Sequence, residues 1–241
     1  MRSQQKWVVM LLMIVAVALS LTQAQNATQK RVIDKTLWPL TDHSTPEPSD
    51  AQARLKRRAR GKNHDKSEWR VDPTDPADNT TTVDGVDLTL SDIPLVQSKT
   101  VVRGEVLGAQ AYLSNDKTGV YSEFTIQVDE VIKNNDVLSL TQGCLIDADR
   151  KGGRVRFASG RIHWYSVDKE NMPRVGTRYI FFLTREDTLE DFHILTAYEL
   201  NAGKVFALDE LPQFRKHDGE EEAAFLARMH ALVVTSLQGT Q

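Results

Sequence analysis

The chain has 241 residues, 26% of them charged, which is enough for one medium domain with tails. Its formal net charge of −3 argues against a protein built as a whole to bind nucleic acid, because such proteins carry a basic excess. Its single cysteine, Cys144, excludes an intramolecular disulfide, so the core alone must hold the folded part together.

The first 24 residues have the composition of a secretory signal peptide. Arg2 and Lys6 supply the positive start, residues 7–21 are almost wholly apolar, and Thr22 and Ala24 place small residues before a cleavage site. The apolar run is shorter than the roughly 20 residues of a membrane span. We therefore expect an exported protein, periplasmic or extracellular. The alternative is an uncleaved signal anchor in residues 7–21, and only then would the N-terminus associate with a membrane.

Residues 25–90 are predicted to be a disordered, charged linker, because prolines are frequent and large apolar side chains are sparse. Residues 53–62 carry six basic side chains and no acidic one, whereas residues 72–92 are acidic. The basic block has three possible roles. It could attach the chain electrostatically to an anionic surface, serve as a dibasic processing site, or act only as a solvated tether.

Residues 91–212 change to the pattern of short strands. The stretches at 101–113 and 120–133 are rich in β-branched and aromatic residues. In the second stretch Phe124, Ile126 and Val128 alternate with polar residues, which is the period of a half-buried strand. In the first stretch, Gly104 and Gly108 stand where a coiled strand can bend.

Three further features complete the predicted domain. A hairpin is expected between CLIDADR and RVRFAS, turning at 151–153, and a second one turns at 201–203. The stretch TRYIFFL, at 177–183, is apolar on both faces, as in the most buried strand of a sheet. Six to eight short strands without intervening helices predict an all-β fold, a small OB-like barrel or sandwich. Residues 218–237 are predicted to form a C-terminal helix that packs on this barrel.

The order VVRGEV, YLSNDKTGVYSEFTIQVDEVIK, a Gly-Gly turn, PRVGTRYIFFL and GKVFAL resembles a recurrent β-domain of exported bacterial proteins. The pattern of predicted strands is also similar to the OB-like barrel of netrin modules and metalloproteinase inhibitors, although the cysteines on which those proteins depend are absent here. The resemblance covers roughly residues 92–210. It implies a fold and carries no activity, cofactor or site residue.

No catalytic or metal motif is recognisable in the sequence. Cys144 beside Leu145 and Ile146 is expected to be a packing residue, and not a nucleophile served by His163. The histidines are scattered, and a pairing of His163 with His193 across strands is the one two-histidine site considered. We expect no cofactor and no enzymatic activity. An unrecognised hydrolase and a protease-inhibitor-like barrel stay open as alternatives.

The best candidate surface is the basic and aromatic stretch around the first hairpin. Cations interleaved with aromatic rings suit an anionic ligand, and export favours an acidic glycan, a lipid headgroup or a protein partner over nucleic acid. Alternatively, the aromatic residues belong to the core and the cations only keep an edge soluble. The predicted binding residues are Arg150, Lys151, Arg154, Arg156, Arg161, His163, Trp164 and Tyr165.

Overall fold

The structure, a computed structural model, describes residues 34–69, 71, 80–83, 85, 87–185 and 191–238. The chain divides into two units, Met1–Asp34 and Lys35–Gln241, and every element below belongs to the second. The expected signal peptide at 1–24 lies outside the described residues. No helix in the part of the chain that is described combines the length and apolar composition needed to cross a membrane.

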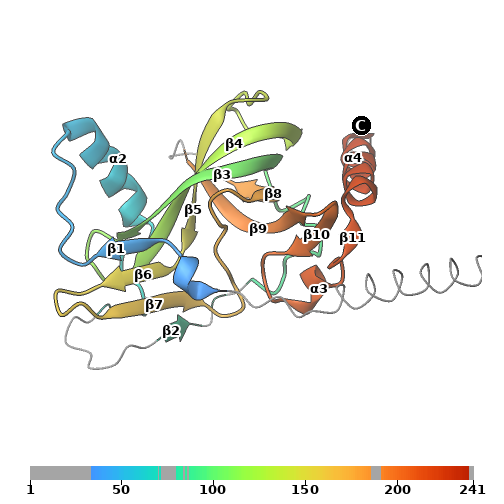
Figure 1. The fold of residues 1–241 in the computed structure, drawn as a ribbon. Helices are drawn as coiled ribbons and strands as arrows, with labels where there is room; N and C mark the ends of the chain where they lie inside the picture. The colour runs from blue at the N-terminus through green and yellow to red at the C-terminus, as the bar shows by residue number, and fades with distance from the viewer. Residues whose placement is uncertain are drawn as a thin grey trace, which may run out of the picture. The chain divides into compact units, whose positions relative to one another are not determined.

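Among the described residues, five strands form a closed barrel (Figure 1). They are neighbours in the order β9, β5, β4, β3, β8, and the pairing of β8 with β9 closes the ring. The prediction of an all-β barrel is therefore confirmed. The strands are β3 (Thr100–Leu113), β4 (Val120–Asn134), β5 (Leu145–Lys151), β8 (Arg178–Thr184) and β9 (Phe192–Asn201).

The barrel interior is apolar, as the strand alternation predicts. Phe124, Ile126 and Val128 on β4 are fully buried, and they pack with Val102 of β3 and Phe181 of β8. Burying large apolar side chains in this way stabilises a fold by about 1.5–3 kcal/mol each. This cluster is the main core of the domain.

The glycines of β3 lie at irregularities of the barrel wall. The register between β3 and β4 shifts next to Gly104 and again before Gly108. A Cβ atom at Gly104 would lie 2.5 Å from the carbonyl oxygen of Gln127, so only glycine permits this approach. The register shifts thus coincide with the two glycines at which a bend is expected.

A second, smaller sheet lies beside the barrel, with its strands in the order β1, β6, β7, β2. β6 and β7 form an antiparallel hairpin, and the two outer strands join it in parallel. The outer strands both come from the segment expected to be a linker. The strands are β1 (Leu40–Asp42), β2 (Thr80–Val83), β6 (Gly153–Arg156) and β7 (Ile162–Val167).

The prediction of a hairpin that turns at 151–153 is wrong, because the hairpin is formed by the next pair of strands, β6 and β7. β5 does not pair with β6; the chain instead passes from the barrel into the small sheet at Gly152 and Gly153, whose φ angles are +113° and +145°. A Cβ atom at Gly152 would lie 2.8 Å from the carbonyl oxygen of Tyr165. Two glycines thus serve a sheet-to-sheet crossing here, and the real hairpin turns between β6 and β7.

The C-terminal part covers the outer face of the barrel. β9 turns into β10 (Lys204–Ala207) at Ala202 and Gly203, as predicted, and α3 (Pro212–Arg215), β11 (Glu220–Glu221) and α4 (Glu222–Gln238) follow.

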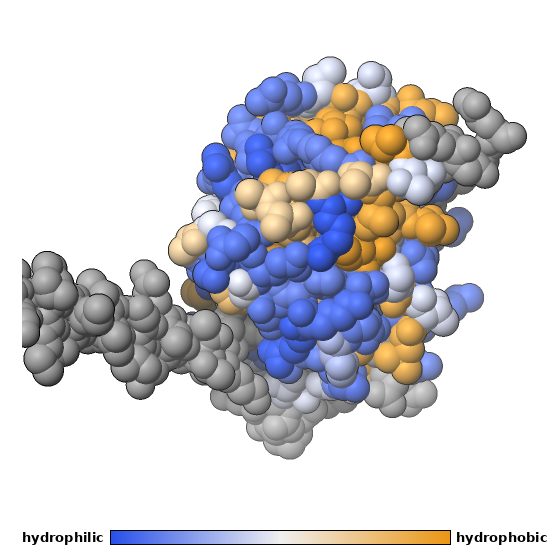
Figure 2. Space-filling model, turned by 90° about the vertical axis from the view of Figure 1, so that its right-hand side faces the viewer, coloured by the Kyte–Doolittle hydropathy of each residue, from blue (hydrophilic) through white to orange (hydrophobic). Residues whose placement is uncertain are grey.

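Helix α4 packs on the barrel, in agreement with the predicted C-terminal helix. Its Phe225 and Met229 are fully buried against Phe182 of β8 and Tyr198 of β9. Figure 2 shows this side of the molecule, on which hydrophobic residues gather among hydrophilic ones. Leu232 of α4 is 42% exposed.

The prediction of an unfolded linker needs correction over residues 34–69. This stretch contains the short 3-10 helix η1 (Lys35–Leu37), strand β1 and helix α2 (Ala51–Lys62). Trp38 and Trp69 are buried, at 2% and 4% exposure, in the barrel core and under the small sheet. The two tryptophans of the segment therefore anchor it. Other parts of 25–90, namely 25–33, 70, 72–79, 84 and 86, lie outside the described residues.

Candidate functional site

The outer face of the barrel wall is polar where β4 and β5 pair. Residues that alternate with the buried core residues face outward, and the register places Glu123 opposite Asp149 and Thr125 opposite Asp147. Carboxylates gathered in this way repel one another unless cations lie between them. Helix α2 lies beside the barrel (Figure 1), and its side chains supply these cations.

Helix α2 begins at a conventional cap and ends against the barrel wall. The side chain of Asp50 accepts a hydrogen bond from the backbone N–H of Ala53 at 2.7 Å, which stabilises the first turn. At the other end, a Cβ atom at Gly61 would lie 2.7 Å from the side-chain oxygen of Asn115. A small residue is therefore needed for the helix to approach the wall.

Arg60 is the main contact between α2 and the wall. Its guanidinium, in a residue only 6% exposed, binds the carboxylates of Asp191 and Glu123 and donates to Asp147 at 3.2 Å. Lys56, one turn earlier, adds an ion pair with Asp147 at 3.3 Å. A planar guanidinium suits several carboxylates at once, because its donors are held in a rigid fork.

Two histidines bind the same buried carboxylate. The Nε2 atom of His64 lies 2.8 Å from Oδ2 of Asp149, and the Nδ1 atom of His193 lies 2.9 Å from Oδ1. The ring of His64 also stacks on Tyr121, with 4.4 Å between the ring centroids. Because an ionised carboxylate only accepts hydrogen bonds, both facing nitrogens carry their protons.

A pocket of about 290 Å³ opens beside this cluster. Its wall comes from the end of α2, the end of β5, the loop after β7 and the start of β9. The lining residues are Arg60, Asn63, His64, Gly85, Asp149, Lys151, Val167, Glu170, Asp191, Phe192 and His193. This volume is at the small end of the range for pockets that hold small-molecule ligands.

The electrostatics of the pocket favour an ion pair between Asp149 and His193. Burial disfavours a charged Asp149, but hydrogen bonds from His193 and His64 outweigh it and hold the pKa of this carboxyl far below its usual value. Packing of the His193 ring into the wall also disfavours its charge, yet Asp149 outweighs this and raises the pKa of His193. The two shifts together favour the charged pair, an ionised Asp149 beside a protonated His193.

Glu123 behaves in the opposite way to Asp149. Its burial, together with the negative charges of Asp191 and Asp147, raises its pKa to about 7, although Arg60 opposes the shift. Glu123 is not among the residues that line the pocket, and a structural ion-pair network such as its pair with Arg60 also produces shifts of this size.

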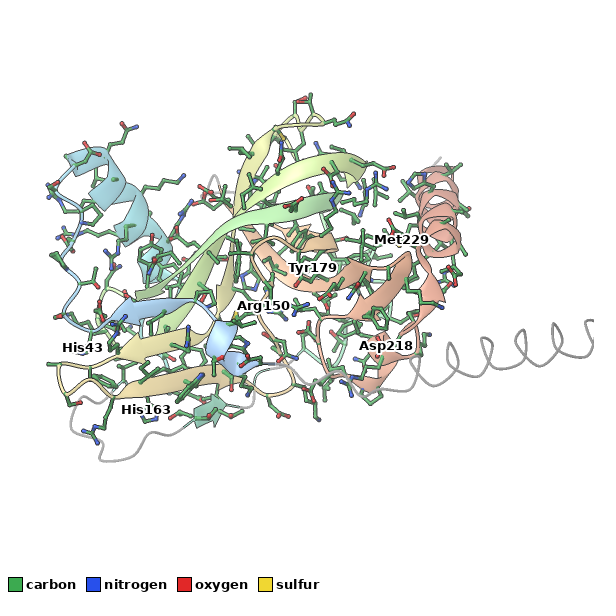
Figure 3. The ribbon with its side chains drawn as sticks, in the orientation of Figure 1. His43, Arg150, His163, Tyr179, Asp218 and Met229 are labelled. Carbon is green, nitrogen blue, oxygen red and sulfur yellow. The ribbon has the colours of Figure 1, made fainter. Side chains whose placement is uncertain are left out.

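Arg150 lies behind the pocket, inside the molecule (Figure 3). It is 1% exposed, donates to Asp209 at 2.8 Å and to Glu170 at 3.3 Å, and also binds the carbonyl oxygen of Asn171. It is therefore not a surface cation, and its inclusion in the predicted binding surface is corrected. The sequence shows the basic cluster around it but not the acid 59 positions later that neutralises it.

The remaining predicted surface residues divide between the two faces of the small sheet. His163 and Tyr165 are buried, at 3% and 2% exposure, and join the cluster that contains Trp69 and Phe157. They are core residues. For Tyr165, the alternative that the aromatic side chains of this stretch belong to the core is therefore correct.

Arg154, Arg156 and Trp164 occupy the opposite face. Arg154 and Trp164 are paired across β6 and β7, and both donate hydrogen bonds to the chain at 35–38. Arg156 forms an exposed ion pair with Asp42, and Arg161 binds the hydroxyl of Ser159. The structure therefore does not bring the eight predicted residues onto one surface; only Lys151 lines the pocket.

Cys144 lies just before β5, half-buried against the barrel core. His163 packs in the separate cluster of the small sheet, so the two are not neighbours in one core. The histidine pairing is also different from the one considered: His193 shares Asp149 with His64, not with His163.

Sequence reasoning missed the residues that matter most in the pocket. His64 and Arg60 were assigned to a linker, because α2 is too hydrophilic for an apolar stripe to mark it. The Asp-Ala-Gln-Ala start at 50–53, an N-cap followed by good helix formers, was the one available indication.

Comparison with known proteins adds no assignment. The sequence matches no family model and no curated protein. The resemblance to exported bacterial β-domains therefore stays a prediction. Among the described residues, no group of three or more His, Cys, Asp or Glu side chains is placed to hold a metal ion.

Proposed function

We propose that the protein is an exported, non-catalytic binding module whose ligand site is the pocket between α2 and the barrel. The composition of residues 1–24 supports export. The pocket replaces the basic hairpin as the binding site, because three of the predicted surface residues are buried and the others diverge.

The carboxylate of Asp149, shared by His64 and His193, carries the proposal. Holding a charge at such a buried position costs stability unless every partner is present. If the network served only to attach α2, its side chains could fill the space between helix and wall. Instead about 290 Å³ stays open beside His193, whose side chain is 44% exposed. Perturbed titratable groups lining a concave site are the usual mark of a binding site.

A ligand screen on the folded protein tests this proposal. Small polar molecules of several classes would be added to ¹⁵N-labelled protein, and shifted amide signals would be mapped onto the structure. We expect changes at residues 60–64, 149–151 and 191–193, and we expect His64→Gln to weaken them. His230→Gln is the matched control, because His230 is exposed and pairs with Glu130 on another part of the barrel. Two results would contradict the proposal: amide shifts that are unchanged in His64→Gln, or shifts that map to residues outside the pocket.

A second candidate, a hydrolase, is favoured by one observation. A carboxylate bound to Nδ1 of a half-exposed imidazole is the arrangement of a general base, with Nε2 facing the reactant. No serine, threonine or cysteine lines the described part of the pocket, so this chemistry would require attack by water. Ester or phosphoester hydrolysis that is lost in His193→Gln would support this function over binding alone.

A further inference from the structure

The carboxylates of the pocket wall are already bound by cations of the protein. Asp149 is bound by two histidines, Asp191 by Arg60, and Glu170 by Arg150 at 3.3 Å. Burial also raises the pKa of Glu170, which weakens its negative charge further. The wall therefore holds acids without presenting strong unpaired negative charge to a ligand.

Two nitrogen groups of the wall keep donor capacity. Lys151 is half-buried, and within the described part of the chain no carboxylate lies within ion-pair distance of its Nζ. Its ammonium instead lies 5.0 Å from the ring centroid of Trp69, which orients the side chain without neutralising it. The second group is the Nε2 side of His193, because Asp149 binds only its Nδ1.

The strand register brings these two groups to the same part of the wall. Asp149 pairs with His193 between β5 and β9, and Lys151 follows Asp149 by two residues, so it projects from the same face of β5. An ammonium and an imidazolium that line the same confined pocket attract a negative group.

We propose that the pocket binds the oxyanion of a small molecule, a carboxylate or a phosphate, between Lys151 and His193. This inference rests on the proposed function and names its ligand class. The pocket volume of about 290 Å³ admits a small acid or a single acidic sugar unit, and a longer polymer only by its end.

The hydrogen bond to Asp149 gives the site a proton requirement. Nδ1 of His193 carries its proton toward Asp149, so Nε2 donates to an anion only when the ring is an imidazolium. The groups facing this ring are Asp149, Glu170 and Arg150; the two carboxylates favour the charged ring, and Arg150 opposes it. Oxyanion binding should therefore take up a proton and weaken as the pH rises.

Titration calorimetry with inorganic phosphate, citrate and glucose tests the inference on the full chain. The phosphate and citrate arms distinguish the two oxyanion sources, and glucose is the neutral probe. We expect one oxyanion to bind at pH 5.5 and its affinity to fall as the pH rises past the raised pKa of the His193 ring. Lys151→Gln and His193→Gln should each reduce the affinity at pH 5.5 by about tenfold or more.

Two comparisons keep the result interpretable. Lys216→Gln makes the same charge change at an exposed site beyond α3, and it should leave the affinity unchanged. Melting curves identify any variant that fails to fold. If His193→Gln fails to fold, the affinity of Lys151→Gln alone tests the inference. Equal binding by Lys151→Gln and the natural protein would overturn the inference. Neutral ligands that bind in a His64-dependent manner while oxyanions do not would also overturn it, but would leave the proposed function standing. If no class of molecule in the screen binds, both the oxyanion inference and the proposed function are wrong.

Discussion

The guanidinium of Arg150 donates a hydrogen bond to the carboxylate of Asp209 at 2.8 Å, and both residues are 1% exposed. Asp209 also accepts from the hydroxyl of Thr196 and the backbone N–H of Asn171. The pair thus connects β5 with β9 and with the loops after β7 and β10.

Removing one member of this pair should destabilise the protein strongly. Arg150→Met leaves a buried carboxylate without its cation, and breaking a buried pair in this way costs about 3–5 kcal/mol. Urea unfolding measures the change. The double variant Arg150→Met with Asp209→Leu should recover part of the loss, because the buried Asp209 carboxylate is removed together with its cation, whereas Glu170 still lacks Arg150. A single variant as stable as the natural protein would show that Arg150 is a solvated surface cation after all.

The segment before the barrel should be required for full stability. Trp38→Ala and Trp69→Ala each remove a buried indole, and such truncations cost about 3–5 kcal/mol. Leu55→Ala on α2 is the control, because Leu55 is 69% exposed. Limited proteolysis should leave a protected fragment that begins before Trp38. A stable fragment beginning near residues 86–98 would restore the tether interpretation for the whole stretch.

Two kinds of residue differ in how well their roles could be predicted from the sequence. Phe124, Ile126 and Val128 alternate within five positions, so the strand and its buried face follow from local pattern. Arg60 and Arg150 look like surface cations locally, and only partners 20–131 positions away give them buried roles. The barrel was therefore predictable, whereas the pocket depends on long-range charge pairing that residue spacing does not reveal.

Glu123 should make the stability of the protein fall as the pH rises. Its pKa of about 7 in the folded state exceeds the ordinary value of 4.5, so the folded protein holds this proton more tightly than the unfolded chain. The resulting stabilisation is complete below about pH 4.5 and is lost as the pH rises through about 7. Glu123→Gln should therefore reduce the fall between pH 4.5 and 7.5 by about 1–3 kcal/mol.

Unfolding curves at several pH values measure this effect. Glu221→Gln is the matched control, because the Glu221 side chain is 69% exposed and its removal should leave the pH profile unchanged. If Glu123→Gln and Glu221→Gln give the same profile, the burial of Glu123 beside Arg60 has no energetic consequence.

Gly152 should tolerate no side chain, because the chain passes there from the barrel to the small sheet. Its φ of +113° is rare for residues with a Cβ atom, and that atom would lie 2.6 Å from the methyl carbon of Met172 and 2.8 Å from the Tyr165 carbonyl oxygen. Gly160 also has a positive φ, of +85°, but a Cβ atom there would meet nothing within 4 Å. Gly160→Ala should therefore cost only about 1–2 kcal/mol of backbone strain. Gly152→Ala adds the clash to a similar strain, and we expect a total loss of about 3 kcal/mol or more. Thermal and urea unfolding of the two variants compare the costs directly. Equal losses would mean that the two sheets separate easily at this crossing, and that the packing of Gly152 against Met172 and Tyr165 does not hold them together.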